Sequence, residues 1–101
     1  MEEQVVLKFG GSSVESIEKM QKVAMRIIAK KESHQGVVVV VSAMGKTTNQ
    51  LLDLAKQAAK YPSKREIDML ISTGEQVSIS LLTMILNEKN AQAIALTGLQ
   101  A

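Results

Sequence analysis

Apolar residues along the chain follow two alternating spacings, one typical of buried strands and the other of amphipathic helices. Val37–Val41 is a run of five valines, as expected for a parallel strand buried on both faces. Residues 4–9 and 91–96 are the other two predicted strands. Helical spacing of apolar residues extends over 13–32, 48–60, 64–71 and 75–88. The order β-α-β-α-α-α-β predicts an α/β fold whose parallel strands are joined by right-handed crossovers.

Short polar motifs mark the predicted helix starts. Each pairs Ser or Thr with Glu or Gln three residues later, which is the capping-box pattern. The motifs begin at Ser12, Thr47, Ser63 and Ser72. The last of them predicts a break between the helices 64–71 and 75–88. A turn is predicted over 33–36, and it leaves His34 in solvent.

Composition narrows the class of protein. A chain of 101 residues that is 46% hydrophobic fits one small domain with a packed core. Twelve basic and ten acidic residues are interspersed, and there is one Phe, one Tyr and no Trp, which argues against a nucleic-acid partner. Cysteine is absent, which excludes disulfides and thiolate metal sites. With no signal-peptide pattern and only short apolar runs, we expect a cytoplasmic protein with no membrane partner.

The candidate chemistry begins where the first predicted strand ends in Gly10 and Gly11. A strand that turns through two glycines into a helix brings N–H groups and the positive end of a helix dipole to one point. Lys8 adds a positive charge beside them. The pattern predicts a nucleotide or a phosphorylated ligand near residues 8–13. A tight turn without a ligand, next to an exposed lysine, is the alternative interpretation.

Three predicted loops, 8–13, 42–48 and 97–101, follow the carboxyl ends of the predicted strands. Parallel strands place these loops at one edge of the sheet, where ligands of open α/β sheets bind. A sheet of three strands would have two open edges, which favours self-association. Because the chain stops within this cluster of loops, we expect it to be the N-terminal part of a longer protein.

Four segments, in chain order, resemble the motifs of the aspartate kinases in the amino-acid kinase superfamily. They are Lys8–Val14, Val40–Leu51, Ser72–Gln76 and Leu96–Ala101. The resemblance implies a three-layer αβα sandwich with a parallel central sheet, similar to carbamate kinase. Residues 1–101 would form the N-terminal part of the catalytic domain, without the nucleoside-binding part and the ACT regulatory domains.

The resemblance also implies an activity. Aspartate kinases transfer the γ-phosphoryl group of ATP to the side-chain carboxylate of L-aspartate, which gives 4-phospho-L-aspartate on the route to lysine, threonine and methionine. ATP would arrive with Mg²⁺, and the sequence shows no dedicated set of metal ligands. The 101-residue chain by itself is expected to be inactive.

Site residues are implied by the match to the family's motifs. Lys8, as the catalytic residue, would hold the ATP phosphates together with Phe9, Gly10, Gly11, Ser12 and Ser42, while Thr47, Thr48 and Glu75 would bind aspartate. Several of these residues also have a structural interpretation. Ser12 and Thr47 suit helix caps, Glu75 suits a capping-box partner, and the hydroxyl of Ser42 can bond its own backbone.

Two alternatives to an aspartate kinase stay open. One is a non-enzymatic phosphate-binding module, or a subunit that another chain completes. The other is a different amino-acid kinase, such as one that acts on glutamate.

Overall fold

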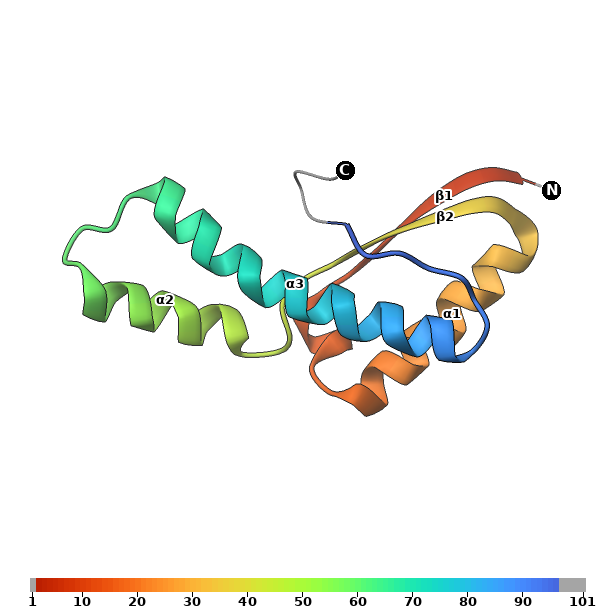
Figure 1. Cartoon of the computed structure of the whole chain (residues 1–101), viewed down its shortest axis with the longest axis horizontal. Helices are drawn as coiled ribbons and strands as arrows, with labels where there is room; N and C mark the ends of the chain where they lie inside the picture. Colours follow the sequence, from red (N-terminus) through yellow and green to blue (C-terminus); the bar gives the residue numbers. More distant parts are fainter. Residues whose placement is uncertain (1, 97–101) are drawn as a thin grey trace.

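Two parallel strands and three long helices make up residues 2–96, the part of the chain that the computed structural model describes (Figure 1). The elements are β1 (Glu2–Phe9), the 3₁₀ helix η1 (Gly11–Val14), α1 (Ile17–Ser33), β2 (His34–Val41), α2 (Thr47–Ala58) and α3 (Lys64–Glu88). The α/β class and the positions of the first two strands are confirmed.

β1 and β2 are parallel neighbours, with Val5 opposite Val37 and Phe9 opposite Val41. In this register both strands end at the same edge of the sheet. The connection through α1 places its apolar stripe against one sheet face. The buried residues of that stripe are Met20, Val23, Ala24 and Ile27, at the spacing of one helix face. They form the core together with Phe9, Val41 and residues of α3.

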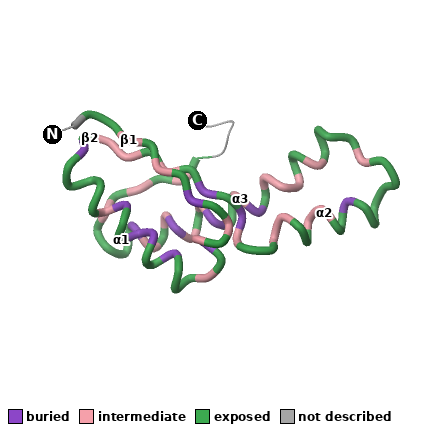
Figure 2. The backbone as a smooth tube through the Cα atoms, turned by 180° about the vertical axis from the view of Figure 1, so that it is seen from behind, coloured by how far each residue is buried: buried purple, intermediate pink, exposed green. Residues whose placement is uncertain are grey.

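The other face of the two-stranded sheet is exposed. Val6, Val38 and Val40 keep 58%, 50% and 49% of their surface in contact with solvent. Burial therefore alternates along β2 (Figure 2). The prediction that Val37–Val41 is buried on both faces is wrong for the described chain, because α1 and α3 pack against β2 and no described element covers Val38 and Val40.

α3 packs against both α1 and α2, and α2 and the first half of α3 form a hairpin that projects away from the sheet (Figure 1). By length and composition alone, α3 could also cross a membrane. A helix that is apolar around most of its circumference is either such a span or an interior helix. Only 22% of this apolar stretch is buried in the described chain. Its buried residues, Gly74, Ser78, Leu82 and Leu86, form one stripe, while Met69, Val77 and Met84 are exposed.

The predicted break between 64–71 and 75–88 is wrong, because α3 is continuous. The hydroxyl of Ser72 donates to the carbonyl of Met69 at 2.7 Å, and that of Thr73 donates to the carbonyl of Leu70 at 2.6 Å. Both side chains thus bond back to their own helix and do not cap a new one.

The other three capping predictions have mixed outcomes. Ser63 caps α3, since its Oγ accepts from the N–H of Glu66 at 3.3 Å, as predicted. The prediction for Ser12 is wrong because the chain first forms η1, and Ser16 caps α1. The prediction for Thr47 is also wrong. α2 begins at Thr47 itself, and the capping position is Lys46, which makes no side-chain cap.

Two further predictions concern the segments around His34 and residues 91–96. His34 starts β2 and is only 7% exposed, with its Nδ1 2.8 Å from the carbonyl oxygen of Lys30, so the predicted exposed turn is wrong. Residues 91–96 form no strand. Asn90 adopts a φ of 64° and the N–H of Ala91 returns to the carbonyl of Leu86 at 2.9 Å, which ties this segment to the end of α3. The predicted loop 97–101 lies outside the described residues.

Candidate functional site

The loops that follow β1 and β2 lie side by side and are joined through their backbones. The N–H of Ser42 donates to the carbonyl of Phe9 at 3.1 Å, which extends the strand pairing by one residue. Further on, the N–H of Gly45 donates to the carbonyl of Gly11 at 3.0 Å. The structure therefore brings the first two sequence motifs together at one edge of the sheet, as the parallel topology predicts.

The two glycines of the first loop differ in their surroundings. A Cβ on Gly11 would lie 2.9 Å from the carbonyl oxygen of Ala43, so this position requires glycine for close packing. A Cβ on Gly10 would meet nothing within 4 Å, and its φ of −79° suits any residue. The tight-turn interpretation accounts for Gly11. It leaves Gly10 unexplained, and the space beside Gly10 is open.

This turn contains backbone N–H groups that have no hydrogen-bond partner in the described range. In η1 the N–H of Ser13 donates to the carbonyl of Gly10 at 3.1 Å. The N–H groups of Gly11 and Ser12 precede the first such bond and donate to no other residue in the described range. Lys8 is exposed at the end of β1, opposite Val40. The turn thus offers two backbone donors close in sequence to a mobile cation, which suits an anionic group.

The second loop leads directly into α2. Gly45 has a φ of +40°, a conformation that favours glycine, and a Cβ there would lie 3.1 Å from the Cβ of Glu15. The N–H of Thr47 donates to the carbonyl of Met44 at 2.8 Å. Thr47 and Thr48 are half-buried in the first turn of α2, where the helix dipole favours an anionic group. Ser42 is exposed at the start of the loop.

The third motif reaches this loop through Gly74. A Cβ on Gly74 would lie 3.0 Å from both the Cβ of Ala43 and the Cγ2 of Thr47. α3 therefore contacts the second loop and the start of α2 at this point. Glu75, the next residue, is half-buried. The sequence left the location of this motif open, and the structure places it beside the second.

Phe9 has two separate roles in this arrangement. Its ring is 7% exposed and belongs to the core, with the guanidinium carbon of Arg26 5.2 Å from the ring centroid. Only its backbone lies at the strand end, where its carbonyl accepts from Ser42. Any contact of Phe9 with a ligand is therefore a backbone contact.

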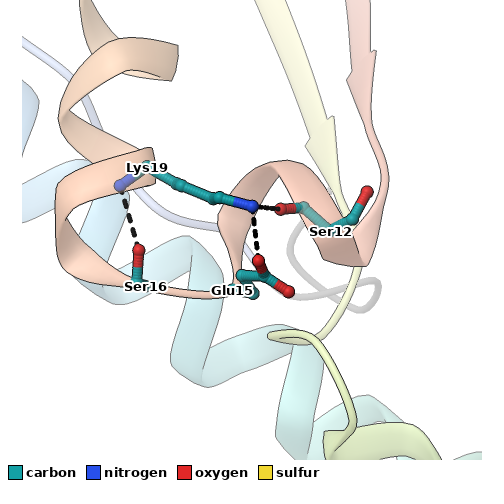
Figure 3. Close-up of polar contacts among 4 residues, drawn as sticks. All are labelled: Ser12, Glu15, Ser16 and Lys19. Atoms are coloured by element: carbon teal, nitrogen blue, oxygen red, sulfur yellow. Dashed lines mark hydrogen bonds and ion pairs between the residues drawn. The ribbon is translucent and has the colours of Figure 1, made fainter.

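Lys19 is a residue of this region that the sequence reasoning missed. Its backbone N–H donates to the Oγ of Ser16 at 3.1 Å. Its ammonium group donates to the carbonyl of Ser12 at 3.4 Å and pairs with the carboxylate of Glu15 (Figure 3). The spacing of Glu15 and Lys19, four residues apart, is a recognisable signal for an ion pair, but it is common on helices.

Metal-ligating side chains are scattered over the described part of the chain. Within residues 2–96, no three or more of them lie close enough together to hold a metal ion.

Comparison with known proteins gives relatives along nearly the whole chain. It is 62% identical over 97 residues to an aspartokinase of Geobacillus stearothermophilus, which covers 96% of this chain and 24% of that protein. It is 59% identical to aspartokinase 2 of Bacillus subtilis over the same length. A crystal structure of aspartate kinase from Synechocystis superposes with a TM-score of 0.84 at 52% identity, covering 90% of this chain and 16% of that one.

The chain thus spans about a quarter of the length of these sequence relatives. Residues 3–101 match the sequence pattern of the amino acid kinase family. This range includes the glycine turn, the second loop and the Ser-Thr-Gly-Glu segment that meet at the end of the sheet. On this match, the chain belongs to the amino acid kinase family.

Proposed function

We propose that this chain forms the phosphate- and aspartate-binding part of an aspartate kinase. The reaction transfers the γ-phosphoryl group of ATP to an oxygen of the aspartate side-chain carboxylate, with ADP as the leaving group. The observation that carries the proposal is the convergence of three motifs. Gly11 is bonded to Gly45, and Gly74 packs against Ala43 and Thr47, so that all three meet beside the same strand ends.

The glycine turn would hold the phosphates. The unpaired N–H groups of Gly11 and Ser12 are suited to phosphate oxygens, and the open space at Gly10 lets a ligand approach the backbone. Lys8 is the residue we assign to charge stabilisation during transfer, because its side chain is exposed next to this turn. Phosphoryl transfer depends mainly on positioning and electrostatics, so these groups suffice for the protein's part at this end.

The amino acid would bind on the other side of the joined loops. Thr47 and Thr48 would bind a carboxylate at the start of α2, and Glu75 would pair with the ammonium group. The contact of Gly74 with Thr47 brings the Glu75 segment next to these threonines. Ser42 is the first residue of the loop that connects β2 to α2, between the phosphate and aspartate groups of the proposed site. This arrangement supports an acceptor that carries both charges, as aspartate does.

Magnesium would enter with ATP. It supplies charge neutralisation between phosphate oxygens when bound. In this segment, the N–H groups of Gly11 and Ser12 and the side chain of Lys8 are the groups we assign to the phosphates. The remaining nucleotide contacts would come from protein chain other than this segment, and we expect the 101-residue chain alone to be inactive. A cytoplasmic location is part of the same proposal.

The exposed sheet face supports association with further protein. Val6 and Val38 lie opposite each other in the register, and Val40 follows on the same face. Three exposed valines in a patch are costly in water. We infer that this face is covered in the working protein, either by the rest of a longer chain or by another copy.

An exchange of segments tests the proposed activity. The 97 matched residues of the Geobacillus stearothermophilus aspartokinase would be replaced by the corresponding residues of this chain. ATP-dependent formation of aspartyl hydroxamate is then measured. We expect activity close to that of the unmodified relative with aspartate, and little with glutamate. A hybrid that folds but phosphorylates neither would refute the proposal, and a preference for glutamate would favour the other kinase.

Lys8→Ala in the same hybrid tests the catalytic assignment. Loss of a group that stabilises transition-state charge is expected to lower kcat/KM about 100- to 1000-fold. Lys22→Ala is the matched control, because Lys22 is also exposed and forms no ion pair or side-chain hydrogen bond with a described residue. Equal activities of the two variants would contradict the role of Lys8.

A further inference from the structure

Lys19 makes contacts that link α1 to the turn assigned to phosphate. Its ammonium group donates to the carbonyl of Ser12 at 3.4 Å, within η1, and pairs with the carboxylate of Glu15, which directly follows η1 (Figure 3). Its own backbone N–H is fixed on the capping Ser16 at 3.1 Å. One residue of the first turn of α1 is thus bonded to three residues of the preceding loop.

We propose that Lys19 is a positioning residue for the glycine turn, which keeps the N–H groups of Gly11 and Ser12 in place for nucleotide. This role rests on the proposed function. The hydrogen bond to the carbonyl of Ser12 fixes the peptide group that follows Ser12. A short 3₁₀ helix that begins at the second of two glycines has little stability of its own, because it has few backbone hydrogen bonds and glycine has many accessible conformations. An outside contact is therefore needed to hold its orientation.

Glu15 gives Lys19 a second effect on the same site. The side chain of Glu15 lies against the second loop, since a Cβ on Gly45 would be 3.1 Å from its Cβ and 3.7 Å from its Oε2. Its carboxylate thus lies next to Gly45 of the second loop. Without a partner, this negative charge would oppose the binding of a phosphate. The ammonium group of Lys19 pairs with this carboxylate and offsets its charge.

The exposure of the Lys19–Glu15 ion pair argues against a role in folding stability alone. The side chains of Lys19 and Glu15 are 48% and 43% exposed. Ion pairs with such exposure contribute little to folding stability. Loss of Lys19 is therefore expected to disorder residues 11–14 and to weaken nucleotide binding. The free energy of unfolding of the whole chain should change little.

The first measurement requires no ligand. Amide hydrogen exchange of the 101-residue chain is compared for the native sequence, Lys19→Met, Lys19→Arg and the control Lys22→Met. We expect Lys19→Met to accelerate exchange about tenfold at Ser13, whose N–H donates to Gly10, and at Val14, while α3 is unchanged. Lys19→Arg keeps a donor for both oxygens and is expected to exchange like the native chain. Unchanged exchange at Ser13 and Val14 in Lys19→Met would overturn the positioning role.

The second measurement is made in the hybrid with the Geobacillus stearothermophilus relative. Lys19→Met is expected to raise KM for ATP about tenfold, with kcat and KM for aspartate changed less than about threefold, because the turn holds phosphate before and during transfer. Lys19→Arg should restore KM. An unchanged KM for ATP would overturn the role. Inactivity of the hybrid with native Lys19 would instead refute the proposed function, and the exchange result would still report on the turn.

A double variant separates the two effects of Lys19. Glu15→Gln combined with Lys19→Met removes the unpaired negative charge but does not replace the hydrogen bond to Ser12. We expect partial recovery of KM for ATP. Full recovery would mean that charge alone matters and would overturn the assignment of positioning.

Discussion

The joined loops at the end of the sheet and the tip of the α2–α3 hairpin are stabilised in different ways. At the loops, backbone groups bond directly to each other and three glycines, Gly11, Gly45 and Gly74, allow the segments to approach. At the tip, alanines of α2 face Ile67 and Leu70 of α3, and most residues are exposed (Figure 2). The loops therefore tolerate little added volume, whereas the tip has room to adjust.

The largest effect is expected from Gly11→Ala. The new methyl group would lie 2.9 Å from a backbone oxygen of Ala43, which cannot move without breaking the contact between the loops. We expect the free energy of unfolding to fall by about 3 kcal/mol. Chemical denaturation followed by circular dichroism measures this. Gly10→Ala is the matched control, with a change within about 0.5 kcal/mol, because a Cβ there meets nothing within 4 Å.

A smaller effect is expected from Gly74→Ala. Its methyl group would lie 3.0 Å from the side chains of Ala43 and Thr47, while alanine favours the helix by about 1 kcal/mol over glycine. We expect a net loss of about 1–2 kcal/mol, since overpacking exceeds the gain in propensity. Adding Ala43→Gly removes one of the opposing methyl groups and should recover part of the stability. If Gly74→Ala alone were more stable than the native chain, α3 would not be tightly packed against the second loop.

The smallest effect is expected at the tip, from Ser63→Ala. This change removes the cap on α3 that accepts from the N–H of Glu66, and should cost about 0.5–1 kcal/mol. Ser72→Ala, in the middle of α3, is the comparison and should be near neutral, because its hydroxyl bonds back to its own helix. A larger loss for Ser72→Ala than for Ser63→Ala would contradict the continuous α3.

The sequence predicts correctly the helix with the most regular apolar spacing and the strand with the longest run of β-branched residues. The stripe of α1 and the valine run of β2 were both identified from spacing alone. The prediction for residues 91–96 failed because this segment is bonded to the end of α3 and not to an edge of the sheet. The N–H groups of Ala91 and Ala93 donate to the carbonyl of Leu86 and to the side chain of Asn87. The break at Ser72 failed for a related reason. A Ser-x-x-Glu pattern fits a helix start, but its hydroxyl can also bond inside a helix.

The candidate site was predictable in its residue types and only partly in its geometry. Parallel topology was enough to place the glycine turn beside the second loop. It could not place Glu75, because the path of α3 depends on Gly74, which packs against Ala43 and Thr47, 31 and 27 residues earlier in the sequence. Lys19 was missed because its proposed role depends on a hydrogen bond to the carbonyl of Ser12. Every residue has a backbone carbonyl, so the sequence does not indicate which one accepts a side-chain bond.

Tyr61 sits at the hairpin tip, 86% exposed, with the ammonium nitrogen of Lys60 5.7 Å from its ring centroid. It is the chain's single tyrosine, and tryptophan is absent. Intrinsic ultraviolet fluorescence of this chain is therefore a signal from the tip alone. A tryptophan introduced beside the joined loops would emit against an almost dark background, so the two regions can be followed at separate wavelengths in one sample.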